Sequence, residues 1–325
     1  MPSPESTFPI PSSTPVHPIK HQAANITGVE TIWTLDDVYI LWNTHDTTLD
    51  ASGGKTCLLG NLGKRGQYKD FICLESSSGQ LLWLKENGVH STIAVTQDGI
   101  IIAYSSGAYV NKFDFQTGDL VWRVPLEGTG SIYLYYLDPH VQVSTANPDK
   151  LWTLDIDGEI IRMMDGHRTF ISANNETYIS LNGLQVLRTD TDQVLWKFTQ
   201  IQRLRQAPLF TAEKIFLRSG ESFSGTAYAL NRANGDVLWE VPYVIGNLTY
   251  SAENQLVYAL QEDGSVLAID ENSGQTTVVV QFSPNPFIFL DGVDPCAYQL
   301  SYDPIEHILV VYLGDSKQLF AFSVD

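Results

Sequence analysis

Short apolar stretches alternate with polar turns along the whole chain, and one such pattern stands out. In residues 226–239, TAYALNRANGDVLW, larger apolar residues alternate with alanines, which is the period of two of a half-buried strand. The Asn-Gly pair that follows marks a tight turn, because glycine takes a positive φ at no steric cost. The Val-Leu-Trp segment after it favours a second strand. The stretch is therefore predicted to form a β-hairpin.

Copies of this hairpin pattern recur along the chain at regular spacing. They lie at 71–83, 110–122, 152–162, 184–196 and 265–278. Their turn glycines follow one another at intervals of about 40 residues, with Asp192 in the equivalent place of one copy. A period near 40 with a hairpin ending in tryptophan indicates one four-stranded antiparallel blade per repeat, so we predict an all-β propeller. Helical repeats are disfavoured, because no copy shows apolar residues at i, i+3, i+4 and i+7.

The two ends of the chain carry complementary halves of one hairpin. Residues 25–33 resemble a second strand, and residues 319–325 resemble a first strand that then stops. We predict that these N- and C-terminal strands pair and close the ring, because closure removes two open sheet edges. Counting hairpins gives seven blades. Eight is the alternative, because the interval from Gly28 to Gly79 and the stretch after Gly274 are each about 50 residues long. Each contains either one blade with an insertion, expected at 44–69 and 283–298, or an extra blade.

Residues 1–24 differ from the rest in composition. Closely spaced prolines alternate there with serine and threonine, which predicts an extended, unpacked tail. Residues 25–325 are predicted to be a single propeller domain. The tail has neither the basic start nor the apolar core of a signal peptide. It resembles the stalk that follows a removed signal or lipid anchor, so we expect an extracytoplasmic protein, periplasmic or at the cell surface, with an anchor upstream of residue 1 as one form of attachment.

Charge and hydropathy narrow the choice of partners. The chain has 37 acidic and 19 basic residues and a formal net charge of −18. A protein this acidic is repelled by phosphate backbones, so we expect no nucleic acid partner. We expect no transmembrane segment either, because no apolar run is long enough to span a bilayer. The prediction is a monomeric propeller.

Two of the three cysteines flank a hydrophilic loop. If 56–59 pairs with 71–74, then Cys57 and Cys73 sit opposite each other on neighbouring strands. A cross-strand disulfide then requires a suitable Cα–Cα distance. Two half-buried thiols are the alternative. No Cys-Cys pair or zinc-ligand spacing is present.

The repeat as a whole resembles a known family. Segments such as FDFQTGDLVW and YALNRANGDVLWEV, with a small-apolar strand, an acidic or polar turn ending in glycine, and a tryptophan, are similar to the quinoprotein-type, or PQQ-like, propeller repeat. The resemblance covers nearly all of residues 26–325. Its non-enzymatic members include the BamB-like group of outer-membrane assembly lipoproteins, which bind partners through loops on one face. It implies protein binding by a scaffold.

Candidate chemistry is sparse. The quinone-dependent members of this superfamily use adjacent cysteines, a tryptophan under the cofactor and a calcium site, and no such set is seen, so we expect no cofactor. Asp155 and Asp157 resemble the start of a calcium loop, but the position of the bidentate glutamate is Gly166. A turn in which aspartate bonds its own backbone is the simpler interpretation. No catalytic or metal-ligating residues are assigned.

Residues 200–206, QIQRLRQ, form a basic island in this acidic chain. Arginine beside an apolar residue is typical of interface anchors, so Arg203, Leu204 and Arg205 are the candidate partner-binding residues. The resemblance adds that a Leu-Arg pair lies on the partner-binding loop of the BamB-like group. The alternative is a solvated loop that packs Ile201 or Leu204 inward. We predict a non-catalytic scaffold that binds protein partners through inter-blade loops. An enzyme or carbohydrate-binding propeller with an axial small-molecule site is the other hypothesis.

Overall fold

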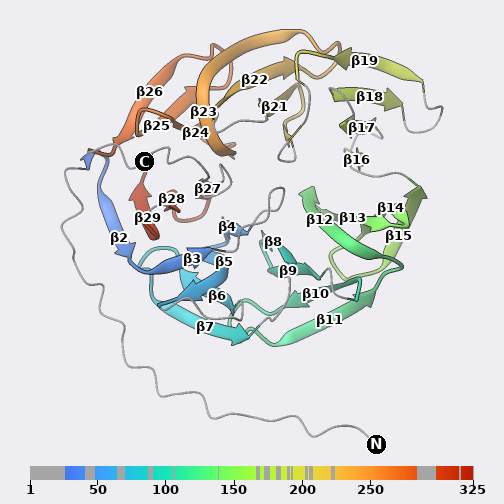
Figure 1. Cartoon of the computed structure of the whole chain (residues 1–325), viewed down its shortest axis with the longest axis horizontal. Helices are drawn as coiled ribbons and strands as arrows, with labels where there is room; N and C mark the ends of the chain where they lie inside the picture. The colour runs from blue at the N-terminus through green and yellow to red at the C-terminus, as the bar shows by residue number, and fades with distance from the viewer. Residues whose placement is uncertain are drawn as a thin grey trace, which may run out of the picture.

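The computed structural model arranges antiparallel β-sheets around a central axis (Figure 1). It describes residues 26–40, 48–63, 70–86, 91–104, 107–137, 139–165, 169–171, 176–180, 184–188, 191, 193–201, 204, 208–220, 224–283, 298–314 and 316–324. Over these ranges every regular element is a strand. Nowhere in them is there a helix long and apolar enough to cross a membrane. The predicted all-β propeller architecture of four-stranded antiparallel sheets is confirmed.

Four of the sheets are each formed by strands that follow one another in the chain. The first contains β3 (Val38–Ile40), β4 (Leu49–Ser52), β5 (Lys55–Leu62), β6 (Asp70–Glu75) and β7 (Leu81–Glu86). The second contains β8 (Ser91–Thr96), β9 (Gly99–Tyr104), β10 (Tyr109–Phe113) and β11 (Leu120–Pro125). The third contains β12 (Thr129–Leu137), β13 (His140–Asn147), β14 (Asp149–Leu154) and β15 (Ile160–Asp165). The fourth contains β16 (Thr169–Ile171), β17 (Glu176–Ser180), β18 (Leu184–Arg188) and β19 (Val194–Phe198).

Two further repeats merge into one eight-stranded sheet. It contains β20 (Leu209–Phe210), β21 (Lys214–Ser219), β22 (Gly225–Asn231), β23 (Val237–Ser251), β24 (Leu256–Gln261), β25 (Ser265–Asp270), β26 (Thr276–Gln281) and β1 (Thr27–Gly28). The merger results from β23, whose 15 residues pair first with β22 and then with β24. A single unbroken strand therefore serves both repeats.

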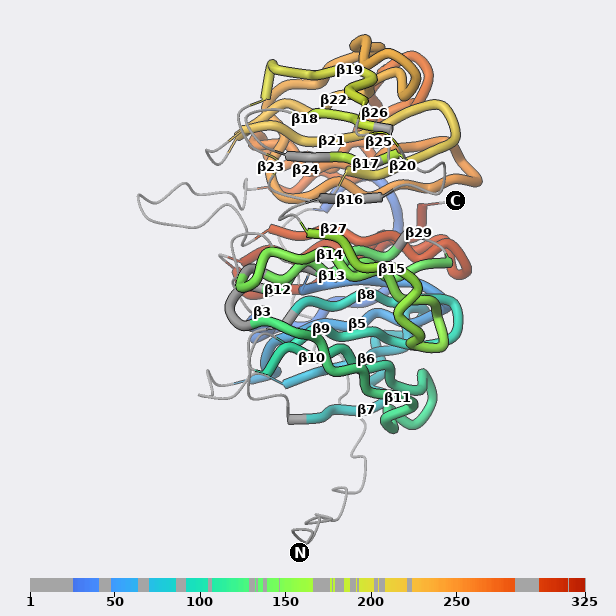
Figure 2. Tube along the Cα trace, turned by 90° about the vertical axis from the view of Figure 1, so that its right-hand side faces the viewer, coloured from blue at the N-terminus to red at the C-terminus, as the bar shows by residue number. Residues whose placement is uncertain are grey.

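The last sheet combines the two ends of the described chain. It contains β27 (Tyr298–Asp303), β28 (Ile308–Leu313), β29 (Gln318–Ser323) and β2 (Thr31–Leu35). β2 pairs antiparallel with β29, with Trp33 opposite Ala321. Figure 1 shows β4, β8, β12 and β27 near the centre and β2, β7, β11 and β19 at the perimeter. In the view turned by 90° the strands run largely across the thickness of the ring (Figure 2).

Tryptophans at the perimeter join neighbouring sheets. Each indole N–H donates to a backbone carbonyl in the outer hairpin turn of the next repeat. The donor–acceptor pairs are Trp33–Ser76 (2.6 Å), Trp83–Phe115 (3.0 Å), Trp122–Ile156 (3.2 Å), Trp196–Arg232 (2.8 Å) and Trp239–Glu271 (3.0 Å). Such a bond satisfies a donor that would otherwise be left unpaired between two packed sheets.

Each of these indoles also lies on a turn glycine. The glycines are Gly79, Gly118, Gly158, Gly235 and Gly274, in the same order as the tryptophans. A Cβ on any of them would lie only 2.5–2.9 Å from an atom of the tryptophan side chain. All five also have positive φ. Glycine is therefore required twice at this place, once by the backbone and once by the indole above it.

Hydrophobic clusters fill the space between adjacent sheets. One cluster, for example, joins Trp33 and Leu319 of the last sheet to Leu58 and Ile72 of the first. Another joins Val110 of the second sheet to Leu134 of the third. The core of the protein is thus divided among the joints between sheets, which is the expected arrangement for a repeat that cannot bury both faces alone.

The expected insertion at 44–69 is corrected in part by the structure. β5 lies inside it and is a central strand of the first sheet, and β4 pairs with β5 as a hairpin. Gly53 and Gly54 both have positive φ at the turn. A Gly-Gly dipeptide is a recognised hairpin signal, so the residues permitted the right assignment. The other expected insertion, 283–298, lies almost wholly outside the described residues.

We expect Gly118→Ala to be clearly more destabilising than Gly63→Ala. Both glycines have positive φ, but only a Cβ at Gly118 meets an indole, that of Trp83 at 2.7 Å, whereas a Cβ at Gly63 meets nothing within 4 Å. The backbone penalty alone should cost about 1–2 kcal/mol at Gly63. Overpacking raises the expected loss at Gly118 to about 2–5 kcal/mol. Urea unfolding of the two variants measures both, and equal losses would show that the indole contact contributes nothing.

Candidate functional site

The structure places the apolar residues of the predicted interface segment in the core. Ile201 and Leu204 are 1% and 6% exposed and pack in one cluster with Trp196 and Tyr228. This is the inward packing that the sequence left open as the alternative for these two residues, so the side chain of Leu204 is not presented on the surface. Arg203 and Arg205 lie outside the described residues. Partner contact by Arg203 and Arg205 therefore stays a prediction.

Cys57 and Cys73 are direct cross-strand partners in the first sheet. Residues 56–59 pair with 71–74 in the register expected from the sequence, and both cysteines are fully buried. Their Cα atoms are 4.2 Å apart, and their sulfur atoms are joined in a disulfide. The bond crosses two neighbouring strands of the sheet, well away from the segment that contains Leu204.

The turn at Asp155 holds its own backbone. One carboxylate oxygen of Asp155 accepts hydrogen bonds from the backbone N–H groups of Asp157 (3.0 Å) and Glu159 (2.8 Å). This is the aspartate turn that the sequence favoured over a calcium loop, because Gly166 stands where a calcium loop has its glutamate. Across the part of the chain that the structure describes, no group of three or more acidic, histidine or cysteine side chains is arranged to hold a metal ion.

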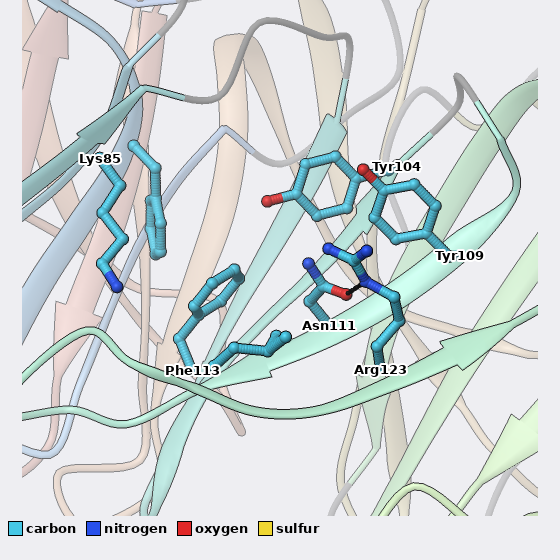
Figure 3. Close-up of a pocket in the computed structure, with 8 residues that line it drawn as sticks. Lys85, Tyr104, Tyr109, Asn111, Phe113 and Arg123 are labelled. Atoms are coloured by element: carbon cyan, nitrogen blue, oxygen red, sulfur yellow. Dashed lines mark hydrogen bonds between the residues drawn. The ribbon is translucent and has the colours of Figure 1, made fainter. Parts of the chain in front are cut away.

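A half-open groove of about 270 Å³ lies between the first and second sheets (Figure 3). Its walls come from β6, β7, β9, β10 and β11. The lining side chains are aromatic, apolar or cationic, with one amide. They are Phe71, Lys85, Tyr104, Tyr109, Asn111, Phe113, Leu120 and Arg123. Among the described residues that line it there is no carboxylate, in a chain of net charge −18.

Arg123 is held in place at one side of this groove. Its Nε donates to Oδ1 of Asn111 at 3.0 Å, and its guanidinium lies over the ring of Tyr109 at 4.6 Å. Tyr109 in turn stacks on Tyr104, with ring centroids 4.6 Å apart and an interplanar angle of 19°. Burial, and then the neighbouring Tyr109, raise the pKa of Tyr104, so its hydroxyl stays protonated at neutral pH. Figure 3 shows Lys85 on the other side of Phe113.

No local sequence motif predicts this groove. Its residues come from five strands of two sheets, and each is an ordinary strand residue on its own. One signal is present only by comparison between repeats. Arg123 directly follows Trp122, one of the tryptophans that dock on the next turn, and Lys197 occupies the same position after Trp196. The tyrosine pair beneath Arg123 has no such regular place in the repeat.

A network at the centre joins three sheets through Asp50 of β4. Its carboxylate accepts hydrogen bonds from Val95 N of β8 (2.7 Å), Ser301 Oγ of β27 (3.0 Å) and Ala51 N (3.0 Å). Burial raises the pKa of Asp50 to about 6, and the charge of Asp303 adds to the increase. The three hydrogen bonds act in the opposite direction and lower the pKa. Both carboxylate oxygens are used by protein donors, so the geometry favours a structural junction at the axis.

These features define a class of protein. Four-stranded antiparallel repeats around an axis, with acidic or polar turns and with five tryptophans that each dock on the turn glycine of the next repeat, make a propeller of quinoprotein-type repeats. The chain belongs to the family described as outer membrane protein assembly factor BamB, whose sequence profile matches residues 69–161 and 149–281.

Individual relatives are distant. The outer membrane protein assembly factor BamB of Moranella endobia (strain PCIT) is 21% identical over 239 residues, which cover 63% of this chain and 60% of that protein. The chain thus spans about 60% of the length of this relative. The crystal structure of BamB from Moraxella catarrhalis has a TM-score of 0.50 at 16% identity, over 91% of this chain and 100% of that one. A chain of the mitotic checkpoint complex has a TM-score of 0.68 at 12% identity, over 100% and 97%. These structural similarities show the shared fold.

We expect Asp50→Asn to change how stability depends on pH. The pKa of Asp50 in the folded protein, about 6, is above its ordinary value of 3.8, so the folded state binds the proton more tightly. Stability from this group is fully present below pH 4 and is lost as pH rises through 6. The shift corresponds to at most about 3 kcal/mol.

The comparison is the unfolding free energy of wild type minus that of Asp50→Asn, measured by urea titration from pH 4 to pH 7.5. It should be larger at pH 4 than at pH 7.5. Using the difference removes the contribution of the other carboxyl groups. A difference that is flat across this range would show that Asp50 keeps its ordinary pKa.

Proposed function

We propose that this protein is a non-catalytic binding scaffold outside the cytoplasm, which holds protein partners through inter-blade loops on one face of the propeller. The observation that carries the proposal is the family match, which spans residues 69–281 and belongs to an outer membrane protein assembly factor. By this proposal the partners are components or substrates of an outer-membrane assembly machinery. The net charge of −18 argues against nucleic acid as a partner.

The packing of the sheets supports a scaffold. The tryptophan bonds tie successive sheets at the perimeter, and the Asp50 network ties three of them at the centre. Loops carried on such a body are held at fixed separations, which lowers the entropy lost when a partner binds several of them. Ile201 and Leu204, both anchored in the core, fix the backbone on either side of position 203. We propose Arg203 and Arg205 as partner contacts.

The cysteines support an extracytoplasmic location. A fully buried disulfide between Cys57 and Cys73 forms and persists in an oxidising compartment and is rare in the cytosol. We propose that the two cysteines are bonded in the mature protein, and that residues 1–24 are a stalk attached to an anchor or signal upstream of residue 1. Residues 25–325 would then be one domain that works as a monomer.

We further infer that the sheets make seven blades in a closed ring. Six repeats lie between β3 and β26, if the eight-stranded sheet is divided at β23, and the sheet of β27–β29 with β2 is the seventh. Pairing of β2 with β29 places Trp33 on Gly79 of the first sheet. The N-terminal strand would thereby both complete the last blade and join it to the first.

We expect Arg205→Glu to reduce capture of the assembly partner at least about 10-fold, because interface arginines are frequent hot spots and the substitution reverses a charge. The measurement is affinity capture by the tagged protein from solubilised outer membranes, quantified by mass spectrometry. Lys197→Glu is the matched control, because it makes the same charge change at an exposed position of β19. Equal capture by the wild type and by Arg205→Glu would remove this loop from the interface.

We expect deletion of residues 1–20 to leave the melting temperature unchanged and deletion through Trp33 to lower it by several degrees or more. The longer deletion removes β2, which pairs with β29, and the buried Trp33, which is 4% exposed. Removing that buried indole alone should lower the free energy of unfolding by several kcal/mol. Scanning calorimetry of the two truncated proteins measures this, and identical transitions would contradict closure by the N-terminal strand.

A further inference from the structure

We propose that the groove between the first and second sheets is a binding site for a small carboxylate that carries a flat ring. The site lies on β6, β7 and β9–β11, apart from the 201–204 segment and from the central Asp50 network. It does not depend on the proposed scaffold function.

Arg123 supplies the carboxylate-binding group. Its Nε donates a hydrogen bond to Asn111, and one face of its guanidinium lies against the Tyr109 ring. Asn111 and Tyr109 are both neutral. Among the residues that the structure describes, Arg123 forms no ion pair, although the chain has 37 acidic residues. The Asn111 side chain that orients the guanidinium is 2% exposed and therefore fixed. An oriented guanidinium with its terminal nitrogens free is suited to bidentate binding of a carboxylate.

The remainder of the lining favours a flat apolar body next to that carboxylate. Phe71 and Phe113 lie with ring centroids 5.6 Å apart, and the exposed side chain of Leu120 borders the same space. Aromatic walls bind rings by stacking and edge contacts. The volume of about 270 Å³ is below the range of sites for drug-sized ligands, so a small ligand is expected.

Lys85 adds a second, weaker attraction for an anion. Its Nζ lies 5.8 Å from the Phe113 ring centroid and 3.5 Å from Oδ1 of Asp119, whose side chain is 79% exposed. An ion pair this exposed is weak, so Lys85 keeps much of its positive field in the groove. Arg123 and Lys85 therefore bracket the aromatic lining, and loss of Arg123 should matter more than loss of Lys85.

The test is a titration of the full chain, with its tyrosines isotope-labelled, followed by NMR. The probe is phenylacetate, with phenylacetamide as the neutral isostere, acetate as the carboxylate without a ring and glucuronate as a carboxylate on a sugar ring. We expect phenylacetate to shift the Tyr104 and Tyr109 signals saturably and to bind at least about 10-fold more tightly than phenylacetamide or acetate. Glucuronate should bind more weakly than phenylacetate, because its sugar ring is puckered and polar.

Variants locate the site. Arg123→Gln should weaken phenylacetate binding at least about 10-fold, and Lys85→Gln should weaken it less. Arg123→Lys keeps the charge but not the planar fork, so it should bind more weakly than wild type. Lys197→Gln, at the equivalent position of β19, should bind as wild type does. Unchanged melting temperatures show that each variant is folded.

Three results would overturn the proposal. One is equal binding of phenylacetate and phenylacetamide, because the carboxylate would then be irrelevant. Another is unchanged binding in Arg123→Gln. The third is a failure of the ring preference, seen either as no saturable shifts at Tyr104 and Tyr109 with phenylacetate up to its solubility limit or as tighter binding of glucuronate than of phenylacetate. None of these results bears on capture of a protein partner, so the scaffold proposal stands or fails separately.

Discussion

The docking of an indole on a turn glycine is the contact on which the ring depends. The tryptophan donates its N–H to a carbonyl of the next turn, and its ring covers the glycine of that turn. The contact therefore fixes distance and orientation between two sheets at the same time. A four-stranded sheet alone leaves apolar side chains on both faces, so each repeat is stable only when its neighbour is held in this position.

Where the indole is missing from the sequence, the turn glycine that it would cover is missing as well. Arg162 stands four residues after Gly158, where the other repeats have tryptophan, and the next repeat has Asp192 in place of the turn glycine. Val278 takes the tryptophan position after Gly274, and no outer hairpin turn follows in the last sheet, because β29 pairs with β2 instead. The two residues thus behave as one unit. A glycine freed of its indole keeps only the backbone reason to be glycine and loses the one that the indole imposed.

Much of the fold could be predicted because its signals are local. The alternating strands, the Asn-Gly and Thr-Gly turns and the terminal tryptophans fall within single hairpins, and the pairing of Cys57 with Cys73 follows from the same register. The β4–β5 hairpin does not follow the repeat pattern, because no tryptophan comes after its Gly53-Gly54 turn as it does in most of the outer hairpins. A sequence of mixed arginine and leucine does not show which side chain turns inward, so the burial of Leu204 is visible only in the structure.

The groove could not be predicted, for a physical reason of the same kind. Tyr104, Tyr109 and Arg123 meet Phe71 and Lys85 only after two sheets have packed. The repeat sets which strand positions face a joint, but it does not set the residues that fill them. The side chains that line the space between two particular sheets can therefore be identified only in the structure. That neighbouring sheets pack against each other can be predicted from the sequence.

The long strand β23 has a mechanical consequence. Because Val237–Ser251 runs without interruption from the perimeter of one sheet to the centre of the next, these two sheets share a backbone and have no connecting loop between them. The two repeats therefore form one continuous double-width panel, whereas neighbouring repeats elsewhere in the ring lie in separate sheets.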